Sequence, residues 1–282
     1  KTKTGTNILA HGKDPYFDPW RDTVQINFFS EQARQQAVNE LLRIADLADG
    51  VRCDMAMLGL NEIFEKNWGR LLKNSRRPQT EFWEEIISQV KARNPQFIFL
   101  AEVYWDLEWR LQQLGFDFTY DKKLYDRLRF SSAPDIRGHL QAELSYQEKS
   151  VRFIENHDEP RAANIFGREK SCAAAAITAT LPGMRFFHDG QLQGKKIHQA
   201  IQFAKEIQEK ADPQAEEFYK RLLEFSKGEP LRSGVWQLLE VLPAGPGNSS
   251  HANLLSWSWR KGASGRLIVV NYSPFQAQGR VQ

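Results

Sequence analysis

Short β-favouring runs alternate with helix-favouring segments along most of this chain, and the alternation restricts the folds it can adopt. The runs expected as strands lie at residues 50–54, 97–102, 116–120, 151–155 and 184–187. The segments expected as helices lie at residues 31–46, 81–93, 107–114, 135–144 and 172–181. Alternating strands and helices with short connections favour parallel βαβ units. The sequence therefore predicts an α/β protein.

The two ends of the chain follow other patterns. Residues 1–30 are punctuated by Gly, Asp and Pro, which predicts a loop-rich segment. Asp212-Pro213 is expected to cap and begin a further helix, and residues 243–250 have the composition of a linker. Residues 254–257 and 267–272 alternate apolar and polar side chains around a glycine-containing turn, which predicts an antiparallel hairpin.

Composition excludes several classes of function. The chain has 282 residues and a net charge of +3 from 38 basic and 35 acidic residues, so it suggests no nucleic-acid partner. No run of about 18 apolar residues is present, and no membrane partner is expected. Two cysteines, Cys53 and Cys172, are too few for a disulfide framework. We expect both thiols to be free, buried and inert, which favours a cytoplasmic location.

Two of the expected strands end in a carboxylate, Asp54 or Glu102, and a third is followed within three residues by Asp158. A carboxylate at the end of an apolar strand is costly to desolvate, so it is seldom present for stability alone. A retaining sugar hydrolase needs an ionised nucleophile, a protonated acid and a further group that holds the sugar. These three residues are therefore the candidate catalytic groups.

The neighbours of Asp54 and Glu102 suggest different charge states for the two carboxyls. On a strand, Arg52 lies on the same side as Asp54 and favours its ionised form. A structural Arg–Asp pair is the alternative interpretation. Glu102 follows an apolar run, so desolvation is expected to raise its pKa as a general acid requires. The alternative is a glutamate that faces solvent at a strand end.

Residues beside these carboxylates are candidates for binding sugar. Tyr104 and Trp105 could stack on a pyranose ring, although Trp105 could equally pack over the rim of the fold. His157 and Asp158 could hydrogen-bond adjacent hydroxyls of one sugar. Loop capping by Asn156 and Asp158 is the alternative. His11, His139, His188 and His198 show no metal-ligand spacing, so no metal site is expected.

Three blocks strengthen this interpretation when they are taken together. Gly-Val-Arg-Cys-Asp (50–54), Leu-Ala-Glu-Val-Tyr-Trp (100–105) and Glu-Asn-His-Asp-Glu-Pro-Arg (155–161) resemble, in this order, signature blocks of the α-amylase superfamily. The resemblance implies that Asp54 is the nucleophile, Glu102 the acid/base and Asp158 the transition-state stabiliser. It also implies that Arg52 orients the nucleophile and that His157 binds the sugar.

The same resemblance implies a (β/α)8 TIM barrel. The three blocks correspond to the fourth, fifth and seventh barrel strands, and the first three strands would precede Lys1. Residues 1–245 would then be an N-terminally incomplete catalytic barrel, in which residues 1–30 end the excursion after the third strand. Residues 246–282 would begin a C-terminal β-sandwich-like domain.

One departure concerns the acceptor side and calcium. Many members carry a histidine four residues past the nucleophile, often after a lysine, where this chain has Leu58 and Met57. The resemblance allows a structural calcium ion, but this departure counts against one. The chemistry itself requires no cofactor.

The resemblance implies a retaining α-glycosidase that acts on oligo- or polysaccharides. A glucanotransferase or isomerase with the same chemistry is the first alternative. A catalytically silent carbohydrate-binding relative is the second. Linkage and chain-length preference, and the oligomeric state, are not encoded in these blocks.

Overall fold

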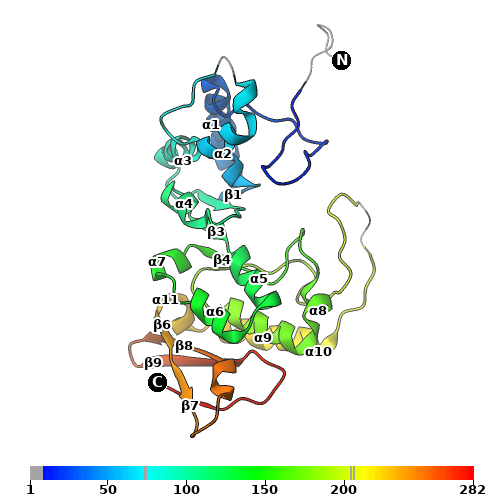
Figure 1. The fold of residues 1–282 in the computed structure, drawn as a ribbon, viewed down its shortest axis with the longest axis vertical. Helices are drawn as coiled ribbons and strands as arrows, with labels where there is room; N and C mark the ends of the chain where they lie inside the picture. The colour runs from blue at the N-terminus through cyan, green and yellow to red at the C-terminus, as the bar shows by residue number, and fades with distance from the viewer. Residues whose placement is uncertain (1–8, 73–74, 204, 206) are drawn as a thin grey trace. The chain divides into compact units, whose positions relative to one another are not determined.

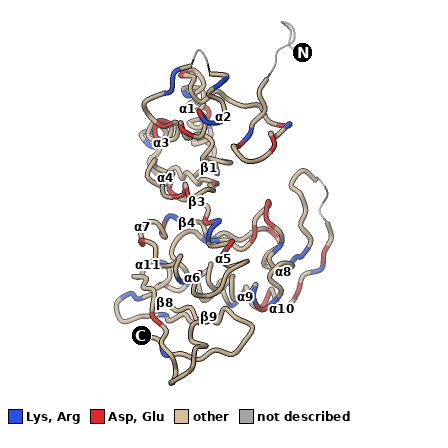
Figure 2. The backbone as a smooth tube through the Cα atoms, in the orientation of Figure 1, with Lys and Arg blue, Asp and Glu red and all other residues tan. Residues whose placement is uncertain are grey.

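A computed structural model describes residues 9–72, 75–203, 205 and 207–282 of the chain (Figure 1). The chain divides into two compact units: unit 1 ends at Tyr120, and unit 2 runs from Asp121 to Gln282. Residues 9–30 of the expected loop-rich segment contain no helix, and one isolated bridge joins Gly12 to Trp20. Residues 1–8 lie outside the described residues. Lysines, arginines and acidic residues are interspersed along both units (Figure 2).

Unit 1 contains alternating helices and parallel strands, as the sequence predicted. Its elements are α1 (Glu31–Ala45), β1 (Gly50–Cys53), α2 (Asn61–Trp68), α3 (Phe82–Arg93), β2 (Ile98–Ala101), α4 (Glu108–Gln113) and β3 (Phe118–Tyr120), with short 3-10 turns at Ala56–Gly59 and Gly69–Leu71. Strand β2 pairs in parallel with both β1 and β3. In the β1–β2 register Cys53 lies beside Ala101, so the two strands end at the same edge.

The core of unit 1 forms between these strands and helices α1 and α3. Phe99, Ile86 and Val90 are fully buried, and Val38 of α1 joins the same cluster. Burying side chains of this size stabilises a fold by about 1.5–3 kcal/mol each. This core holds the strand ends that carry Asp54 and Glu102.

Helix α3 begins one residue later than the expected segment 81–93. Thr80 is a residue type that often caps helices, but the helix begins at Phe82 and Glu81 occupies the N-cap position. The carbonyl of Thr80 instead accepts hydrogen bonds from buried Arg34 and from Asn61. A buried guanidinium needs several acceptors, and the Thr80 carbonyl supplies one of them.

Unit 2 begins with short helices and ends with antiparallel strands. Its elements are α5 (Lys122–Phe130), α6 (Ala133–His139), α7 (Leu144–Gln147), β4 (Ser150–Arg152), α8 (Ala162–Ile165), α9 (Gly167–Thr180), β5 (Met184–Arg185), α10 (Pro213–Ser226), α11 (Glu229–Ser233), β6 (Val235–Leu239), β7 (Val241–Pro243), β8 (Leu254–Lys261), β9 (Ser264–Asn271) and β10 (Gly279–Val281), with a 3-10 turn at Ser250–Asn253. Strands β4 and β5 pair in parallel. Asp212 caps α10 as predicted.

The helix expected over residues 135–144 is two shorter helices. Ser132 and Asp135 form a capping box, so α6 begins at Ala133 rather than at Asp135. It ends at His139, and the side-chain amide of Gln147 donates to the carbonyl of Leu140 at 2.8 Å. That carbonyl is satisfied without a further helical turn, because a side chain replaces the backbone donor.

The predicted C-terminal hairpin is confirmed and belongs to a larger sheet. Strands β8 and β9 pair in antiparallel fashion, and β6 pairs with the other edge of β8. Strand β6 begins at Val235, so the antiparallel strands start earlier than the expected boundary at residue 245. Trp257 is fully buried, and the indole of Trp259 donates to the carbonyl of Thr180 in α9 at 2.7 Å. The division into domains at 245 and 246 stays a prediction.

Both cysteines are free, but only one is buried. Burial raises the pKa of Cys53 to about 12, although the charge of Arg52 opposes this shift. Cys172 is half-buried on α9, which corrects the expectation that both thiols are buried. Within the described ranges no helix combines the length and apolarity that crossing a bilayer would need.

Candidate active site

Asp54 and Glu102 directly follow two neighbouring parallel strands. Asp54 comes one residue after the end of β1, and Glu102 comes one residue after the end of β2. The amide of Glu102 donates to the carbonyl of Cys53 at 3.0 Å, and the amide of Ala56 donates to the carbonyl of Glu102 at 2.9 Å. These bonds extend the strand pairing past the ends of β1 and β2. They hold the two carboxylates at one edge of the sheet.

Arg52 contacts both carboxylates. Its Nη1 pairs with Asp54, and its Nη2 lies 2.9 Å from Oε2 of Glu102. Its guanidinium carbon also lies 5.7 Å from the centre of the Tyr120 ring, within the range of a cation–π contact. Alternation on β1 predicted the Arg52–Asp54 contact. The contact with Glu102 makes Arg52 the shared partner of the two candidate catalytic groups.

Glu102 is buried and hydrogen-bonded through both of its carboxylate oxygens. Its side chain is only 4% exposed. The hydroxyl of Tyr104 donates to Oε1 at 2.6 Å, and the amide of Met55 donates to Oε2 at 2.8 Å. The alternative of a solvent-facing glutamate is therefore wrong.

Burial controls the ionisation of Glu102. Desolvation raises its pKa, and the charge of nearby Asp54 adds to the rise. The bonds from Tyr104 and Met55 and the charge of Arg52 oppose the rise without cancelling it. The direction agrees with the expectation from the apolar run before Glu102, and it suits a general acid.

Asp54 has the opposite environment. Its side chain is 74% exposed, while its neighbour Arg52 is 29% exposed. An accessible carboxylate beside a fixed cation is suited to attack a bound substrate. Two carboxyl groups, one buried and one exposed, thus meet at the same arginine. Such a difference in environment is how one site separates an acid from a nucleophile.

The backbone around these carboxylates is locally strained. Met55 has a φ of 43°, and Trp105 and Asp106 both have a φ of 64°, in the left-handed region that disfavours these residue types. Each such residue costs about 1–3 kcal/mol and occurs most often at functional sites. The turn at Met55 directs its amide toward Glu102. The turn at Trp105 ends the extended segment directly after Tyr104.

Two aromatic residues that the sequence analysis did not select belong to this region. The ring of Tyr16 lies 5.0 Å from the Trp105 ring in an edge-to-face arrangement and is 63% exposed. Tyr120 contacts Arg52 and ends strand β3. The position of Tyr120 at a strand end was a usable signal, because carboxyl ends of parallel strands share one edge. Tyr16 lies in a loop and gave no signal.

In unit 2, His157 and Asp158 follow strand β4 and contact each other. Nε2 of His157 lies 3.1 Å from Oδ2 of Asp158, whose side chain is 53% exposed. Buried Asn156 accepts bonds from the amides of Asp158 and Glu159, both at 2.9 Å. Asn156 therefore caps the loop, as the alternative interpretation proposed for it. This cap leaves the carboxylate of Asp158 accessible.

A buried ion-pair network anchors the same segment. Glu155 pairs with Arg161 at 2.7 Å and accepts a bond from the amide of Ala162 at 2.7 Å. Arg161 also donates to the carbonyl of Asp189 and lies 2.9 Å from Nδ1 of His188. In the sequence, Glu155 and Arg161 stand out only as parts of the third block. The structure assigns them a role in fixing the loop between them.

The structure brings Arg52, Asp54, Glu102 and Tyr104 together in unit 1, and His157 with Asp158 in unit 2. Trp105 packs on Tyr16. The convergence of Asp158 with Asp54 and Glu102 stays a prediction, because the residues belong to different units. Among the described residues, no group of three or more His, Cys, Asp or Glu side chains could hold a metal ion.

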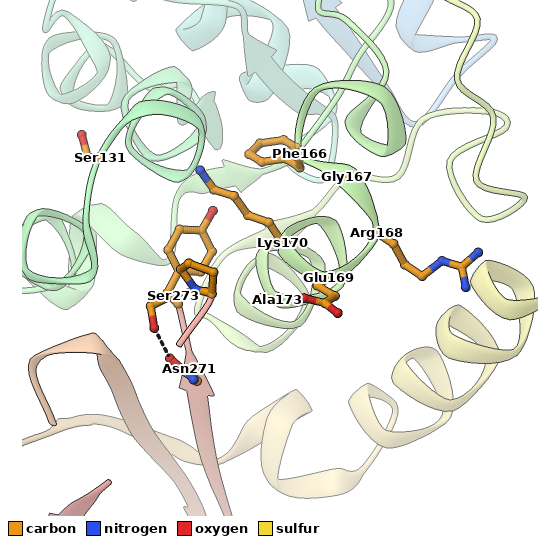
Figure 3. Close-up of a pocket in the computed structure, with 11 residues that line it drawn as sticks. Ser131, Phe166, Gly167, Arg168, Glu169, Lys170, Ala173, Asn271 and Ser273 are labelled. Atoms are coloured by element: carbon orange, nitrogen blue, oxygen red, sulfur yellow. Dashed lines mark hydrogen bonds between the residues drawn. The ribbon is translucent and has the colours of Figure 1, made fainter. Parts of the chain in front are cut away.

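A cavity of about 720 Å³ lies elsewhere in unit 2 (Figure 3). The first turn of α9 and the end of β9 line it, and none of the sequence-predicted site residues does. Lys170 reaches into this region, where its Nζ lies 5.6 Å from the Phe166 ring and 5.5 Å from the Tyr272 ring. Nζ also donates to the carbonyl of Arg129 at 2.9 Å. The ammonium group of Lys170 is therefore already paired within the protein.

Solved structures define the class of fold. A maltogenic α-amylase, AmyB from Thermotoga neapolitana, superposes with a TM-score of 0.64 and 21% identity, over 93% of this chain and 59% of that one. A cyclic α-maltosyl-(1→6)-maltose hydrolase from Arthrobacter globiformis superposes with a TM-score of 0.68 and 15% identity, over 97% and 63%. The chain therefore has the α/β fold of α-amylase-type enzymes. The eight-stranded barrel stays a prediction.

Sequence relatives agree with the fold. The chain is 30% identical over 191 residues to α-amylase MalA of Haloarcula japonica and 24% identical over 201 residues to α-amylase 3 of Dictyoglomus thermophilum. These matches cover 65% and 64% of this chain but only 26% and 37% of the relatives. No protein-family model matches the chain. These matches confirm the resemblance to the α-amylase superfamily, since both relatives are named α-amylases.

Proposed function

We propose that this chain carries the acid and the nucleophile of a retaining α-glycosidase that cleaves α-glucosidic bonds of α-glucans and related oligosaccharides. The observation that carries the proposal is the shared contact of Arg52 with exposed Asp54 and buried Glu102. Retaining enzymes need the two carboxyl groups about 5–5.5 Å apart. A single guanidinium that touches both groups favours such a spacing.

In the first step, Asp54 attacks the anomeric carbon of the bound sugar. A bond forms between a carboxylate oxygen of Asp54 and that carbon while the glycosidic carbon–oxygen bond breaks. Glu102 transfers its proton to the departing oxygen. The raised pKa of Glu102 supports this role, because burial keeps it protonated to higher pH than an ordinary glutamate.

In the second step, water replaces the enzyme on the sugar. Glu102, now a carboxylate, accepts a proton from water, whose oxygen bonds to the anomeric carbon while the bond to Asp54 breaks. Two inversions return the sugar to its original α configuration. If another sugar replaces the water, the same step transfers the glycosyl group, as in the glucanotransferase alternative.

Asp158, His157 and Trp105 complete the proposal. Asp158 and His157 would bind hydroxyls of the sugar at the cleaved bond, with contacts that strengthen as the ring flattens. Trp105, braced by the Tyr16 ring, would stack on a sugar face. These roles require the (β/α)8 barrel that the family resemblance implies. No cofactor is needed.

The test is Asp54→Asn in the intact protein, assayed on maltotriose with anomer-resolved NMR. We expect hydrolysis to fall to background, and Glu102→Gln to lower the rate by about 10²–10⁴. Asp46→Asn is the matched control, because Asp46 pairs with Arg93 on the surface of the same unit. The wild type should release the α anomer first. Near-normal turnover by Asp54→Asn, or initial release of the β anomer, would contradict the proposal. Products longer than maltotriose would favour the transferase.

A further inference from the structure

The two oxygens of Glu102 have chemically different partners. Oε2 faces the backbone amide of Met55 at 2.8 Å and Nη2 of Arg52 at 2.9 Å. Oε1 faces the phenolic hydroxyl of Tyr104 at 2.6 Å. This short distance is typical of a hydroxyl that donates to a charged carboxylate. The partners are therefore matched to the ionised form of Glu102.

The protonated form of Glu102 needs a different arrangement. A backbone amide and a guanidinium can only donate, whereas a phenolic hydroxyl can both donate and accept. A proton on Oε2 would point toward the amide of Met55 and the cation of Arg52, and neither could accept it. A proton on Oε1 would meet the one partner among these three that can turn from donor to acceptor.

We propose that Glu102 carries its exchangeable proton on Oε1, and that Tyr104 is the positioning residue that reverses its hydrogen bond each time the proton leaves or returns. The inference deepens the proposed function and rests on it for the catalytic step. In the free acid, the Oε1–H group donates a hydrogen bond to the Tyr104 oxygen. When substrate binds, this O–H turns to the glycosidic oxygen, and its proton passes there as the glycosidic bond breaks. The Tyr104 hydroxyl, which keeps its own proton, then donates to Oε1 of the new carboxylate.

This role differs from the stacking role that the sequence suggested for Tyr104. The hydroxyl is committed to Glu102, and the left-handed residue Trp105 follows immediately. Together these features hold the phenol beside the acid. Met55 and Arg52 fix the other oxygen, so the carboxyl plane is held from both sides. Tyr104 therefore controls which oxygen presents its proton to the substrate.

Other charged groups face Glu102 but do not distinguish its two forms in this way. Within unit 1 they are Arg52 on β1 and Asp54 just beyond it, with Tyr120 of β3 behind Arg52. Arg52 favours the carboxylate and Asp54 favours the acid. Both effects remain when the Tyr104 hydroxyl is removed. Tyr104→Phe therefore isolates the contribution of the reversible bond.

The test is the titration of Glu102 in the intact protein labelled with ¹³C at glutamate carboxyls, with the signal assigned by its loss in Glu102→Gln. Charge-assisted hydrogen bonds are about twice as strong as neutral ones. Tyr104→Phe therefore destabilises the ionised form of Glu102 more than its protonated form. We expect the midpoint of Glu102 to rise by about one pH unit. The alkaline limb of the pH profile of kcat/KM should move to higher pH by the same amount.

Tyr16→Phe is the matched control, because it removes a phenol from the same unit and keeps the ring that packs on Trp105. It should leave the Glu102 midpoint unchanged. An unchanged or lowered midpoint in Tyr104→Phe would overturn the inference, even in an enzyme that hydrolyses α-glucans. A raised midpoint in a protein that cleaves no α-glucan would support the hydrogen-bond reversal and reject the proposed function. The titration thus separates the two failures.

Discussion

Arg52 lies 2.9 Å from Glu102, yet the pKa of that carboxyl stays above its ordinary value. A cation this close normally favours the charged carboxylate. Burial opposes it and is the larger effect, because the Glu102 side chain is almost fully enclosed. The balance between these two effects sets the pH range in which Glu102 can serve as an acid.

Removing the cation should therefore shift the pH profile. In Arg52→Gln the pKa of Glu102 should rise further, so the alkaline limb of kcat/KM should move to higher pH. The value of kcat should fall at least about tenfold, because Asp54 loses the partner that orients it. Steady-state kinetics across pH measure both effects. Arg43→Gln, which removes a surface cation paired with Glu40, should change neither. If the alkaline limb of Arg52→Gln did not move, the charge of Arg52 would not oppose the effect of burial on the pKa of Glu102.

The strand ends that carry the candidate acid and nucleophile could be predicted because their signals are local. Alternation on β1 placed Arg52 beside Asp54, and the apolar run before Glu102 predicted a raised pKa. Both features depend on neighbours in sequence, and the structure confirms both. The hairpin of β8 and β9 was equally local, since its turn and alternation lie within one short segment.

Features that depend on tertiary structure could not be predicted in this way. Helix α5 was missed, although Asp121 caps it and Leu124 and Leu128 lie on its buried face. Its many charged residues obscured that pattern. The Tyr104 hydroxyl donates to Glu102, and the next residue, Trp105, has a left-handed backbone that a tryptophan rarely adopts. The residue types alone therefore suggested that Tyr104 stacks on a sugar ring, whereas in the structure its hydroxyl donates to Glu102.

Asp121 should be essential to the stability of unit 2. Its carboxylate is fully buried, pairs with buried Arg152 and lies 2.9 Å from Nε2 of His139. Asp121→Asn would leave the charge of Arg152 poorly compensated, which should lower the free energy of unfolding by about 3–5 kcal/mol. Denaturant titration measures this loss. Glu224→Gln in an exposed, 3.8 Å pair with Lys227 should change stability by less than about 0.5 kcal/mol. If the two variants lowered the free energy of unfolding equally, Asp121 would not be essential to the stability of unit 2.

The same carboxylate should make the protein sensitive to acid. Complete burial alone would raise the pKa of Asp121, but Arg152 and His139 outweigh it and lower the pKa to about 2. An unfolded aspartate titrates near pH 4. The stabilisation is therefore complete above about pH 4 and is lost as the pH falls toward 2, by about 2 kcal/mol. Unfolding curves at several pH values should show this loss in the wild type and its absence in Asp121→Asn. A wild-type slope that matches the variant would contradict the prediction.

Gly183, between α9 and β5, should not tolerate a side chain. Its φ is 103°, and a Cβ built there would lie 2.7 Å from the carbonyl oxygen of Gln147 and even closer to that of Ser150. Both obstacles are backbone atoms that cannot rotate away. Gly183→Ala should lower the free energy of unfolding by about 2–4 kcal/mol, from the left-handed backbone and the overlap together. Gly138→Ala is the control, because no atom lies within 4 Å of its added Cβ in helix α6. That variant should be neutral or stabilise by up to about 1 kcal/mol, since alanine favours helix. If thermal and denaturant unfolding found Gly183→Ala as stable as Gly138→Ala, the backbone contact beside β4 would not exist as described.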